Sequence, residues 1–474
     1  MFEAWWNSDI HLILAVIIHA AFVLLSLALT VHILLHKSDP KASFLWIIFV
    51  WLAPFLGAIL YLTFGVNRMA RPAKKNTCLY ENRFHAPTEY EYEGRNAPNG
   101  LGPDFHRLGN NITHSHRIQG NLIQIIEGVQ LIHETIMLAI NTAEQSISLS
   151  TYIFKNDDLG KAISNSLIEA KKRGVDVKVL LDGVGNGPFR SHIRRRLKAA
   201  GIDVRTFLKG FWPWQLPFLN LRNHRKILII DGAIAFTGSL NIGRVKNLET
   251  HFKLQGAILR QIMRTFHRDW CIAGGQPVTD HVSDKYRFET AGTVIARGIR
   301  SGPAYENERL RWILLGALGC AQQEIRILSP YFIPDAGLLS GVKLAALRGV
   351  NVEIILPNTS NYPFADWAAM HQMGDLMQAG CHIYRRSDLF DHSKLLTIDG
   401  KWALIGSSNW DARSLRLNFE FDVECEDPSF VSELDQIIIE RRQKCQPMCF
   451  DDFENRSGLK KVRDAAAHLL LPYL

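Results

Sequence analysis

The sequence predicts an α/β protein made of two tandem α/β sandwich lobes, related by pseudo-twofold symmetry and preceded by an N-terminal two-helix transmembrane hairpin. Three observations predict it. A pattern H-x-K, an apolar run and Asp-Gly occurs twice. An order of helix, strand, helix, Arg-Gly-Val turn and strand also occurs twice, and two long apolar stretches open the chain. Because a repeat fixes the architecture of a chain, the doubled pattern carries the most weight.

The composition limits the classes of protein that fit. The chain has 474 residues, too many for one ordinary domain. A net charge of +8 and a pI of about 9.1 indicate an anionic partner, which could be phospholipid headgroups, nucleic acid or phosphate esters. The seven cysteines are scattered, and we expect neither a disulfide framework nor a metal site.

Residues 1–67 are expected to form the transmembrane hairpin. The stretches 10–35 and 42–66 are each long enough to cross a hydrocarbon core of about 30 Å. Pro54 in the second stretch is tolerated in lipid. A buried hairpin of a soluble protein is the alternative. A cleaved signal peptide is disfavoured because the first four residues lack a basic region.

Positive charges near the hairpin bear on its orientation. Four cations follow the second stretch and favour a cytoplasmic side for the rest of the chain: Arg68, Arg71, Lys74 and Lys75. The short turn between the two stretches carries Lys37 and Lys41, which weakens that asymmetry. Residues 68–115 are polar and turn-rich over most of their length, so they are expected to be a linker.

Two stretches with the same plan follow the linker. Residues 116–285 form the expected first lobe, with a helix at 121–144 and strands at 146–154 and 177–182. Residues 286–474 form the expected second lobe and C-terminal tail, with a helix near 304–323 and strands at 325–332 and 352–357. Alternating strands and helices predict a sheet covered on both faces. The economical arrangement brings both H-x-K segments to the interface between the lobes.

The repeated motif supplies candidate catalytic residues. Its copies are His224, Lys226 and Asp231 in the first lobe, and His392, Lys394 and Asp399 in the second. Alternation along a strand puts each His and Lys on one face, where an imidazole beside an ammonium suits the attack on an anion. Each Asp begins an Asp-Gly turn on the opposite face, so we interpret both as structural carboxylates. A single copy could be a strand end with a satisfied His and a solvated Lys, but the doubling argues against that.

These residues resemble the HKD motifs of the phospholipase D superfamily, and the longer context resembles its bacterial cardiolipin synthases. The segments that carry the resemblance are 221–226, 236–243 and 411–420. The resemblance implies two phospholipase D-like lobes and a membrane-bound enzyme of the bacterial inner membrane. Its reaction would move a phosphatidyl group between two phosphatidylglycerol molecules, giving cardiolipin and glycerol without a cofactor. Phosphatidylglycerol and an anionic membrane are thus the expected partners, and nucleic acid is not. Gln255 departs from the family, which often carries an acid there.

The resemblance also implies roles for the residues. His224 is expected to be the nucleophile that forms a phosphohistidine, and His392 the general acid and base. Lys226 and Lys394 would hold the phosphoryl oxygens. The HKD pattern counts Asp231 and Asp399 with the catalytic residues, against our structural interpretation of them. The accessory residues, taken as phosphate-binding or imidazole-orienting groups, are Ser239, Asn241, Glu249, Ser407, Asn409 and Glu420.

Other functions remain open at this point. Another phospholipase D-type phosphatidyltransferase or a hydrolase would use the same residues, because the shape of the site decides whether water or a lipid hydroxyl meets the intermediate. A nucleic-acid phosphodiesterase also suits a basic chain, but it would not need a membrane anchor. A lipid-binding scaffold is disfavoured because both histidines and both lysines are present. The oligomeric state does not follow from the sequence.

Overall fold

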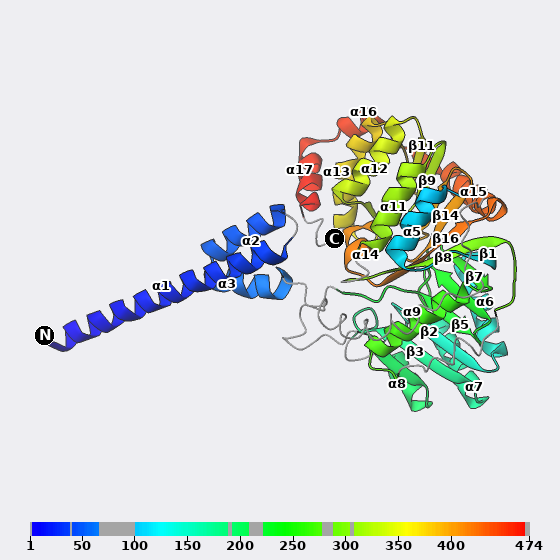
Figure 1. Ribbon diagram of the computed structural model, residues 1–474, viewed down its shortest axis with the longest axis horizontal. Helices are drawn as coiled ribbons and strands as arrows, with labels where there is room; N and C mark the ends of the chain where they lie inside the picture. The colour runs from blue at the N-terminus through cyan, green and yellow to red at the C-terminus, as the bar shows by residue number, and fades with distance from the viewer. Residues whose placement is uncertain are drawn as a thin grey trace. The chain divides into compact units, whose positions relative to one another are not determined.

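The structure is a computed structural model that describes residues 2–37, 40–65, 100–187, 192–207, 221–276, 288–303 and 308–469. The chain divides into a helical N-terminal unit and a large α/β unit (Figure 1). Most of the expected linker, with its four cations, falls in 66–99 and lies outside the described residues. The end of the expected C-terminal tail, 470–474, does so as well.

The N-terminal unit contains one long helix and a broken second one. They are α1 (Phe2–His36), α2 (Pro40–Leu52), α3 (Pro54–Leu60) and a π-helical turn, η1 (Tyr61–Gly65). Among the described residues, only the stretch Leu12–His36 is a helix long and apolar enough to cross a membrane. The second expected crossing is wrong as a continuous helix. Proline has no N–H to donate and restricts the residue before it, and Ala53 leaves the helical region at φ −137° and ψ 74°.

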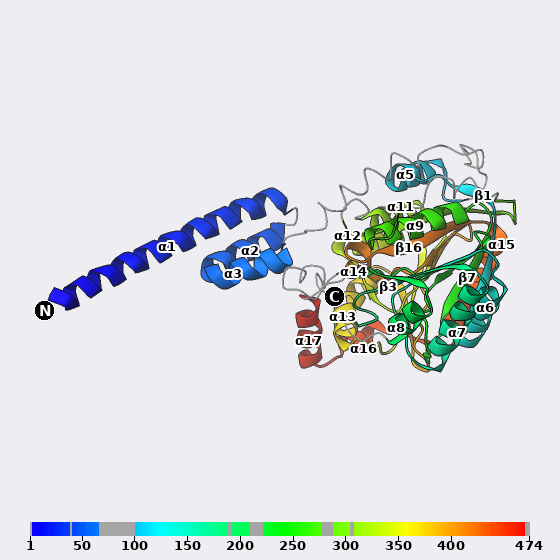
Figure 2. The ribbon, with the colours of Figure 1, turned by 90° about the horizontal axis from the view of Figure 1, so that it is seen from below.

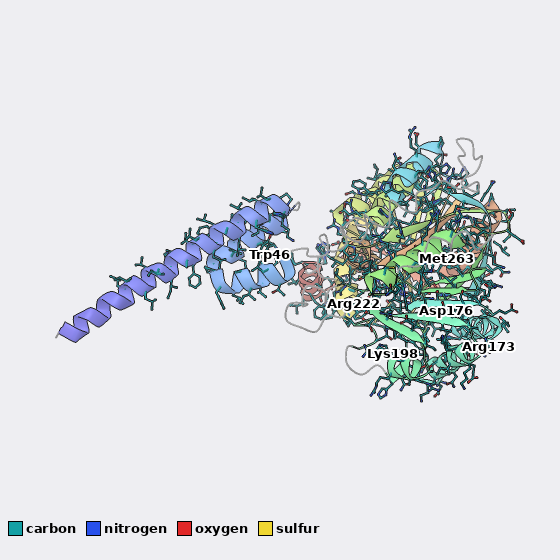
Figure 3. All side chains as sticks on the ribbon, turned by 60° about the horizontal axis from the view of Figure 1, so that its bottom comes forward. Trp46, Arg173, Asp176, Lys198, Arg222 and Met263 are labelled. Carbon is teal, nitrogen blue, oxygen red and sulfur yellow. The ribbon has the colours of Figure 1, made fainter. Side chains whose placement is uncertain are left out.

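The break turns the second segment back on itself. Helices α2 and α3 lie side by side (Figure 2). The ring of Trp46 in α2 (labelled in Figure 3) lies 5.4 Å from the ring of Tyr61 in η1, although the break separates the two residues in sequence. A Cβ on Gly57 would lie 2.8 Å from the Cα of Val50, so only glycine allows α2 and α3 to approach this closely. Both helices pack on α1, where Ser26 Oγ donates to the carbonyl of Val50 at 3.2 Å.

One part of the expected linker is an ordered helix. Helix α5 (Pro103–Thr113) contacts α11, and the ring of Phe105 meets the ring of Trp402 edge-on at 5.6 Å. The linker assignment for 103–113 is therefore wrong. Burial of Phe105 in the core of the second lobe removes apolar surface from water, and this outweighs the polar character of the neighbouring sequence.

The first lobe runs from β1 to α9. Its strands are β1 (Ile118–Glu127), β2 (Ser146–Thr151), β3 (Asp176–Asp182), β4 (Asp203–Phe207), β5 (Ile227–Ile230), β6 (Ile234–Gly238) and β7 (Thr250–Gln255). Its helices are α6 (Val129–Thr142), α7 (Asp158–Lys172), α8 (His192–Ala199) and α9 (Leu259–Ile272). Asp157 caps α7 by accepting from the N–H of Gly160 at 2.9 Å, and the turn after the helix closes on Gly174 at φ 95°.

The second lobe runs from β8 to α17. Its strands are β8 (Val294–Ser301), β9 (Glu324–Leu328), β10 (Phe332–Ile333), β11 (Asn351–Pro357), β12 (His382–Arg386), β13 (Leu395–Ile398), β14 (Trp402–Gly406), β15 (Trp410–Asp411), β16 (Glu420–Glu426) and β17 (Cys445–Pro447). Its helices are α11 (Arg309–Cys320), α12 (Ala336–Leu347), α13 (Pro363–Gln378), α14 (Ala412–Arg416), α15 (Pro428–Gln443), α16 (Phe450–Glu454) and α17 (Gly458–His468). Asp335 caps α12 as Asp157 caps α7.

One mixed sheet runs through both lobes. In the described chain its order is β17-β12-β11-β9-β13-β14-β16-β8-β1-β7-β6-β5-β2-β3-β4. Reading outward from the β8–β1 pair, the strands of the second lobe follow the same order as their counterparts in the first. Helices flank the sheet (Figures 1 and 2), and each lobe has its own apolar core. The pseudo-twofold relation predicted from the repeat is therefore present in the fold.

Two predicted elements differ from the structure. The helix expected at 121–144 begins only at Val129, because residues up to Glu127 form β1. The apolar residues Leu122, Ile123, Ile125 and Ile126 fit a helical spacing, but pairing with β7 and β8 fixes them in an extended strand. Strand β8, the counterpart of β1, is absent from the predicted elements. Together these two strands join the lobes.

Candidate active site

The two motif histidines are held by the backbone of the opposite lobe. His224 immediately precedes β5, and its N–H donates to the carbonyl of Phe419 at 2.9 Å. His392 precedes β13, and its N–H donates to the carbonyl of Leu248 at 2.9 Å. Each carbonyl belongs to the residue just before a candidate carboxylate. The lobes are thus joined at the two segments that carry the candidate chemistry.

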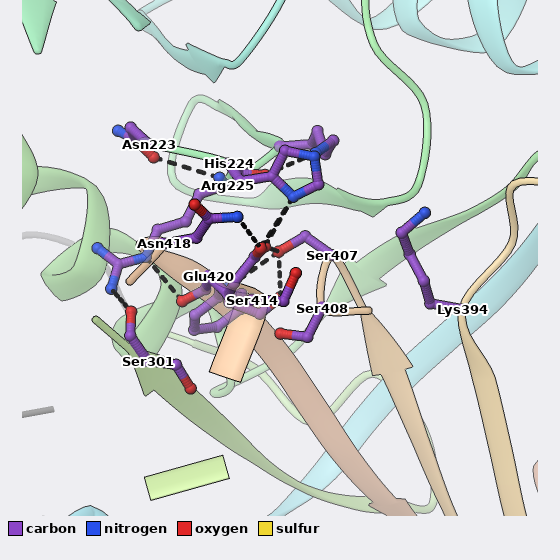
Figure 4. A network of polar contacts seen from close by, with 12 residues as sticks. Asn223, His224, Arg225, Ser301, Lys394, Ser407, Ser408, Ser414, Asn418 and Glu420 are labelled. Atoms are coloured by element: carbon purple, nitrogen blue, oxygen red, sulfur yellow. Dashed lines mark hydrogen bonds and ion pairs between the residues drawn. The ribbon is translucent and has the colours of Figure 1, made fainter. Parts of the chain in front are cut away.

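The imidazole–carboxylate pairs are crossed between the lobes. His224 Nδ1 lies 2.9 Å from Glu420 Oε1, and His392 Nδ1 lies 3.1 Å from Glu249 Oε1 (Figure 4 shows the first pair). An ionised carboxylate accepts the proton on Nδ1, which leaves Nε2 of each neutral ring with its lone pair. The structure therefore brings together both histidines and both glutamates, with each glutamate serving the histidine of the other lobe.

The two motif serines hold these glutamates. Ser407 Oγ donates to Glu420 Oε2 at 2.6 Å, and Ser239 Oγ donates to Glu249 Oε2. Each hydroxyl is buried and also lies within hydrogen-bond distance of a backbone carbonyl. Of the two roles expected for these serines, the contacts favour orienting the imidazoles through the glutamates over binding phosphate. A hydroxyl can donate one hydrogen bond, and each serine hydroxyl donates it to a glutamate carboxylate.

Lys226 and Lys394 are buried beside their own histidines. Lys226 Nζ donates to the carbonyl of His224 at 2.7 Å, and Lys394 Nζ donates to that of His392 at 2.6 Å. Burial lowers the pKa of Lys226 to about 7 and that of Lys394 to about 8. The charges of Glu249 and Glu420 have the opposite effect and raise both pKa values, but burial outweighs them. An anion in the cavity would favour the charged ammonium form of both side chains.

Asp231 and Asp399 support the backbone instead of the imidazoles. Asp231 lies in a turn at φ 54° and accepts the backbone N–H groups of Glu144, Gln145 and Ser146 at 2.7–2.9 Å. Asp399, at φ 55°, accepts three N–H groups from residues 322–324 in the same way. Each carboxylate fastens the start of a neighbouring strand. These contacts favour the structural interpretation of both aspartates over a catalytic role.

A cavity of about 730 Å³ lies between the lobes. Its walls contain equivalent pairs of residues from the two lobes: Tyr152 and Tyr331, His224 and His392, Asn241 and Asn409. Apolar side chains, among them Ile153, Ile242 and Phe364, line it as well. In the part of the chain that the structure describes, no cluster of three or more His, Cys, Asp or Glu side chains could hold a metal ion.

Comparisons with known proteins decide the family. The family model described as "Cardiolipin synthase, PLD-like domain" matches residues 136–270 and 314–442, more than half of the chain. This chain belongs to the cardiolipin synthase family of phospholipase D-like proteins. A second model, "Phospholipase_D-nuclease N-terminal", matches residues 24–65.

Curated relatives of this family match almost the whole chain. The major cardiolipin synthase ClsA of Bacillus subtilis (strain 168) is 30% identical, covering 95% of this chain and 99% of that protein. The cardiolipin synthase of Clostridium perfringens (strain 13 / Type A) is 30% identical, covering 93% and 96%. The crystal structure of phosphatidylserine synthase from Haemophilus influenzae Rd KW20 shares the fold, with a TM-score of 0.61 at 14% identity. It covers 78% of this chain and all of that one.

The two imidazoles of this cardiolipin synthase family member have different electrostatic surroundings. Burial, Lys226, Lys394 and His392 together lower the pKa of His224 well below its usual value. Burial and Lys394 also lower the pKa of His392, but the charge of Glu249 opposes them. Burial works against ionisation of Glu249, yet His392, Lys394 and Ser239 outweigh it and lower its pKa to about 2. Burial raises the pKa of Glu420.

The residues that brace Glu420 are not among those predicted from the sequence. Arg225, the middle residue of the first motif, is fully buried, and its Nε donates to the carbonyl of Glu420 at 2.8 Å. The same guanidinium binds Asp269, and it also donates to the carbonyl of Ser301 (Figure 4). Asn418 Nδ2 donates to Glu420 Oε1 at 3.2 Å. An arginine between the His and Lys of the first motif, where the second motif has Ser393, is the signal that could have drawn attention to this position.

Proposed function

We propose that the protein is a cardiolipin synthase that uses two phosphatidylglycerol molecules and proceeds through a covalent phosphohistidine. Family membership supports the reaction class. The single observation that carries the mechanism is the pair of imidazoles lining one cavity, each bonded through Nδ1 to a buried glutamate. That arrangement directs one Nε2 as a nucleophile and the other as a proton donor towards the same phosphate.

In the first half-reaction, His224 Nε2 attacks the phosphorus of the donor lipid. The bond between phosphorus and the headgroup glycerol oxygen breaks, and protonated His392 gives its Nε2 proton to that oxygen, so glycerol leaves. The low pKa of His224 supports its neutral, nucleophilic form. The pKa of His392 is lowered less than that of His224, because the charge of Glu249 opposes the effect of burial, so a proton favours His392 over His224.

In the second half-reaction, the hydroxyl of a second phosphatidylglycerol replaces glycerol. His392 Nε2 takes the hydroxyl proton as the oxygen attacks phosphorus, and the bond between phosphorus and His224 breaks. Cardiolipin leaves, and both imidazoles return to their starting states. The charges of Lys226 and Lys394, with Asn241 and Asn409 on the cavity wall, would stabilise the phosphoryl oxygens in a site poor in water.

The reaction can be tested with purified full-length protein and phosphatidylglycerol in mixed micelles, with products resolved by mass spectrometry. We expect cardiolipin and glycerol in equal amounts. Phosphatidic acid and glycerol without cardiolipin would identify a hydrolase instead. Brief acid-free quenching followed by peptide mass spectrometry should find the phosphatidyl group on His224. Its recovery on His392 would reverse the two roles.

The membrane arrangement is also a proposal. Helix α1 would cross the bilayer once, while α2, about 20 Å long, is too short to cross about 30 Å. Because α3 turns back, residues 40 and 65 then lie on the same side. Lys37 and Lys41 thus join the four cations of 66–99, and this common side is cytoplasmic by the positive-inside rule. The lobes, which follow residue 65, would lie in the cytoplasm.

Labelling from outside the cell distinguishes one crossing from two. Ser8→Cys and Ser38→Cys variants would be treated with a membrane-impermeant maleimide before and after permeabilisation. A single crossing predicts that Ser8→Cys reacts in intact cells and Ser38→Cys only after permeabilisation. Two crossings with cytoplasmic lobes predict the reverse. The unaltered protein controls for labelling of its own cysteines.

A further inference from the structure

Two arginines line the cavity without a role in the proposed chemistry. Arg222 precedes the first motif (labelled in Figure 3), and Arg413 belongs to α14. Both side chains are partly buried. They come from different lobes, and both line the cavity together with Tyr152. Their position in the active cavity calls for an anionic group of the substrate beyond the phosphate that reacts.

The two guanidinium groups influence each other. Burial, and next the charge of Arg222, lower the pKa of Arg413, and the side chain of Arg222 also bonds to Tyr152. The charge of Asp411 acts in the opposite direction and raises the pKa of Arg413, but burial and Arg222 outweigh it. Like charges in a partly dry cavity repel each other, and a bound anion relieves the repulsion. Guanidinium groups match the oxygens of a phosphate in geometry as well as charge.

The arginine pair breaks the pseudo-twofold symmetry of the cavity. The carbonyl of Arg222 accepts the N–H of Phe419 at 2.8 Å, and at the equivalent position the carbonyl of Phe390 accepts the N–H of Leu248 at 2.9 Å. The arginine in the first lobe therefore corresponds to a phenylalanine in the second. The ring of Phe390 packs near the ring of His392, at 6.0 Å between centroids.

Arg413 has an apolar counterpart too. Trp410 pairs with Phe332 in the second lobe, and Ile242 pairs with Phe154 in the first. Arg413 follows Trp410 by three residues, and Val245 follows Ile242 by three, so Arg413 corresponds to Val245. One wall of the cavity thus carries two cations where the equivalent positions carry Phe390 and Val245. The residues that would react are duplicated between the lobes, but this cation pair is not.

We propose that Arg222 and Arg413 form a subsite for the phosphodiester of the acceptor phosphatidylglycerol, the phosphate that does not react. The inference rests on the proposed function, in which two phosphodiesters enter one cavity and only one exchanges its ester bond. A single glycerol bridge joins the two phosphates in the product, so both lie in the cavity whichever imidazole carries the phosphatidyl group. The subsite would select an anionic lipid acceptor over water and over neutral alcohols.

The test compares an anionic with a neutral acceptor in one reaction. Full-length protein is given phosphatidylglycerol micelles and deuterated glycerol. Transfer to lipid gives cardiolipin, and transfer to glycerol gives deuterated phosphatidylglycerol. Arg222→Gln and Arg413→Gln should each lower cardiolipin formation about ten- to hundredfold, the loss expected for a hydrogen bond to a charged group. Incorporation of deuterated glycerol should remain unchanged, and Arg413→Lys should recover part of the cardiolipin formation.

Arg416→Gln is the matched control, because Arg416 lies on the same short helix but pairs with Glu308 and Asp335 instead of lining the cavity. Its product ratio should equal that of the parent protein. Equal losses of both products in the Arg222 and Arg413 variants, including complete inactivity, would reject the subsite. The proposed function fails separately, if the parent protein exchanges deuterated glycerol but forms no cardiolipin.

Discussion

The two lobes contribute the same candidate reacting groups but different surroundings. His224 and His392 occupy equivalent positions, and so do Glu249 and Glu420. Their neighbours differ, because Arg222 corresponds to Phe390, and Arg225 corresponds to Ser393. A duplicated fold can supply two matched imidazoles for one phosphate. In the proposed reaction two lipids play unequal roles in one cavity, and the residues around the imidazoles would supply the asymmetric wall that this requires.

The largest expected effect tests the equality of the two imidazoles. His224→Ala and His392→Ala should each lower cardiolipin formation by at least about 10²–10⁴, the usual contribution of an acid or base group. The double variant should be little worse than either single one, because the two groups act in one step. Initial rates with phosphatidylglycerol micelles measure this. Substantial activity in either single variant would break the proposed equivalence.

The next effect tests the unequal middle residues of the motifs. Arg225→Met removes the guanidinium that binds buried Asp269, and breaking such a pair costs about 3–5 kcal/mol of unfolding free energy. Ser393→Ala removes only a hydroxyl contact with Thr250 Oγ1 at 2.9 Å, worth about 0.5–1.5 kcal/mol. Denaturant unfolding of both variants gives the comparison. Similar losses would mean that the first motif has no special structural role for its arginine.

The crossed glutamates should have effects on rate and on pH dependence. Glu249→Gln and Glu420→Gln each remove a charged hydrogen bond of about 1.5–3 kcal/mol, which is roughly a 10- to 100-fold loss of rate. The charge of Glu249 raises the pKa of His392, so its removal lowers that pKa. Because His392 must be protonated to release glycerol, the alkaline limb of the rate profile should move to lower pH in Glu249→Gln. An unchanged limb in that variant would contradict the assignment of His392 as the acid.

The smallest effect tests the motif aspartates. Asp231→Asn and Asp399→Asn keep a residue that tolerates positive φ but weaken the bonds to three backbone N–H groups. Each should lower the free energy of unfolding by about 1–3 kcal/mol. The rate per folded molecule should stay the same. It is obtained by dividing the initial rate by the concentration of folded protein, which near-UV circular dichroism measures. A loss of rate without a loss of stability would restore these carboxylates to the chemistry.

The broken hairpin shows where composition alone was insufficient. The apolar run 42–66 is long enough for a crossing. Pro54 interrupts it, but the presence of a proline does not determine whether the chain only kinks or reverses its direction there. Contacts with α1 decide this, including the hydrogen bond of 2.8 Å between His32 Nδ1 and Tyr61 OH. The apolar spacing of β1 predicts a helix, and the structure differs there for a related reason. Its partners β7 and β8 lie far along the chain.

The sequence by itself determined the duplicated α/β plan, the His and Lys of each motif, and the glutamates that follow them. Local spacing and burial patterns carry that information, because each depends on residues near one another in the chain. Only the tertiary structure decided that the glutamates cross between the lobes, that the serines hold them, and that Arg222 and Arg413 line one cavity. These contacts join distant segments, and their geometry is set by how the β1–β8 pair joins the two lobes.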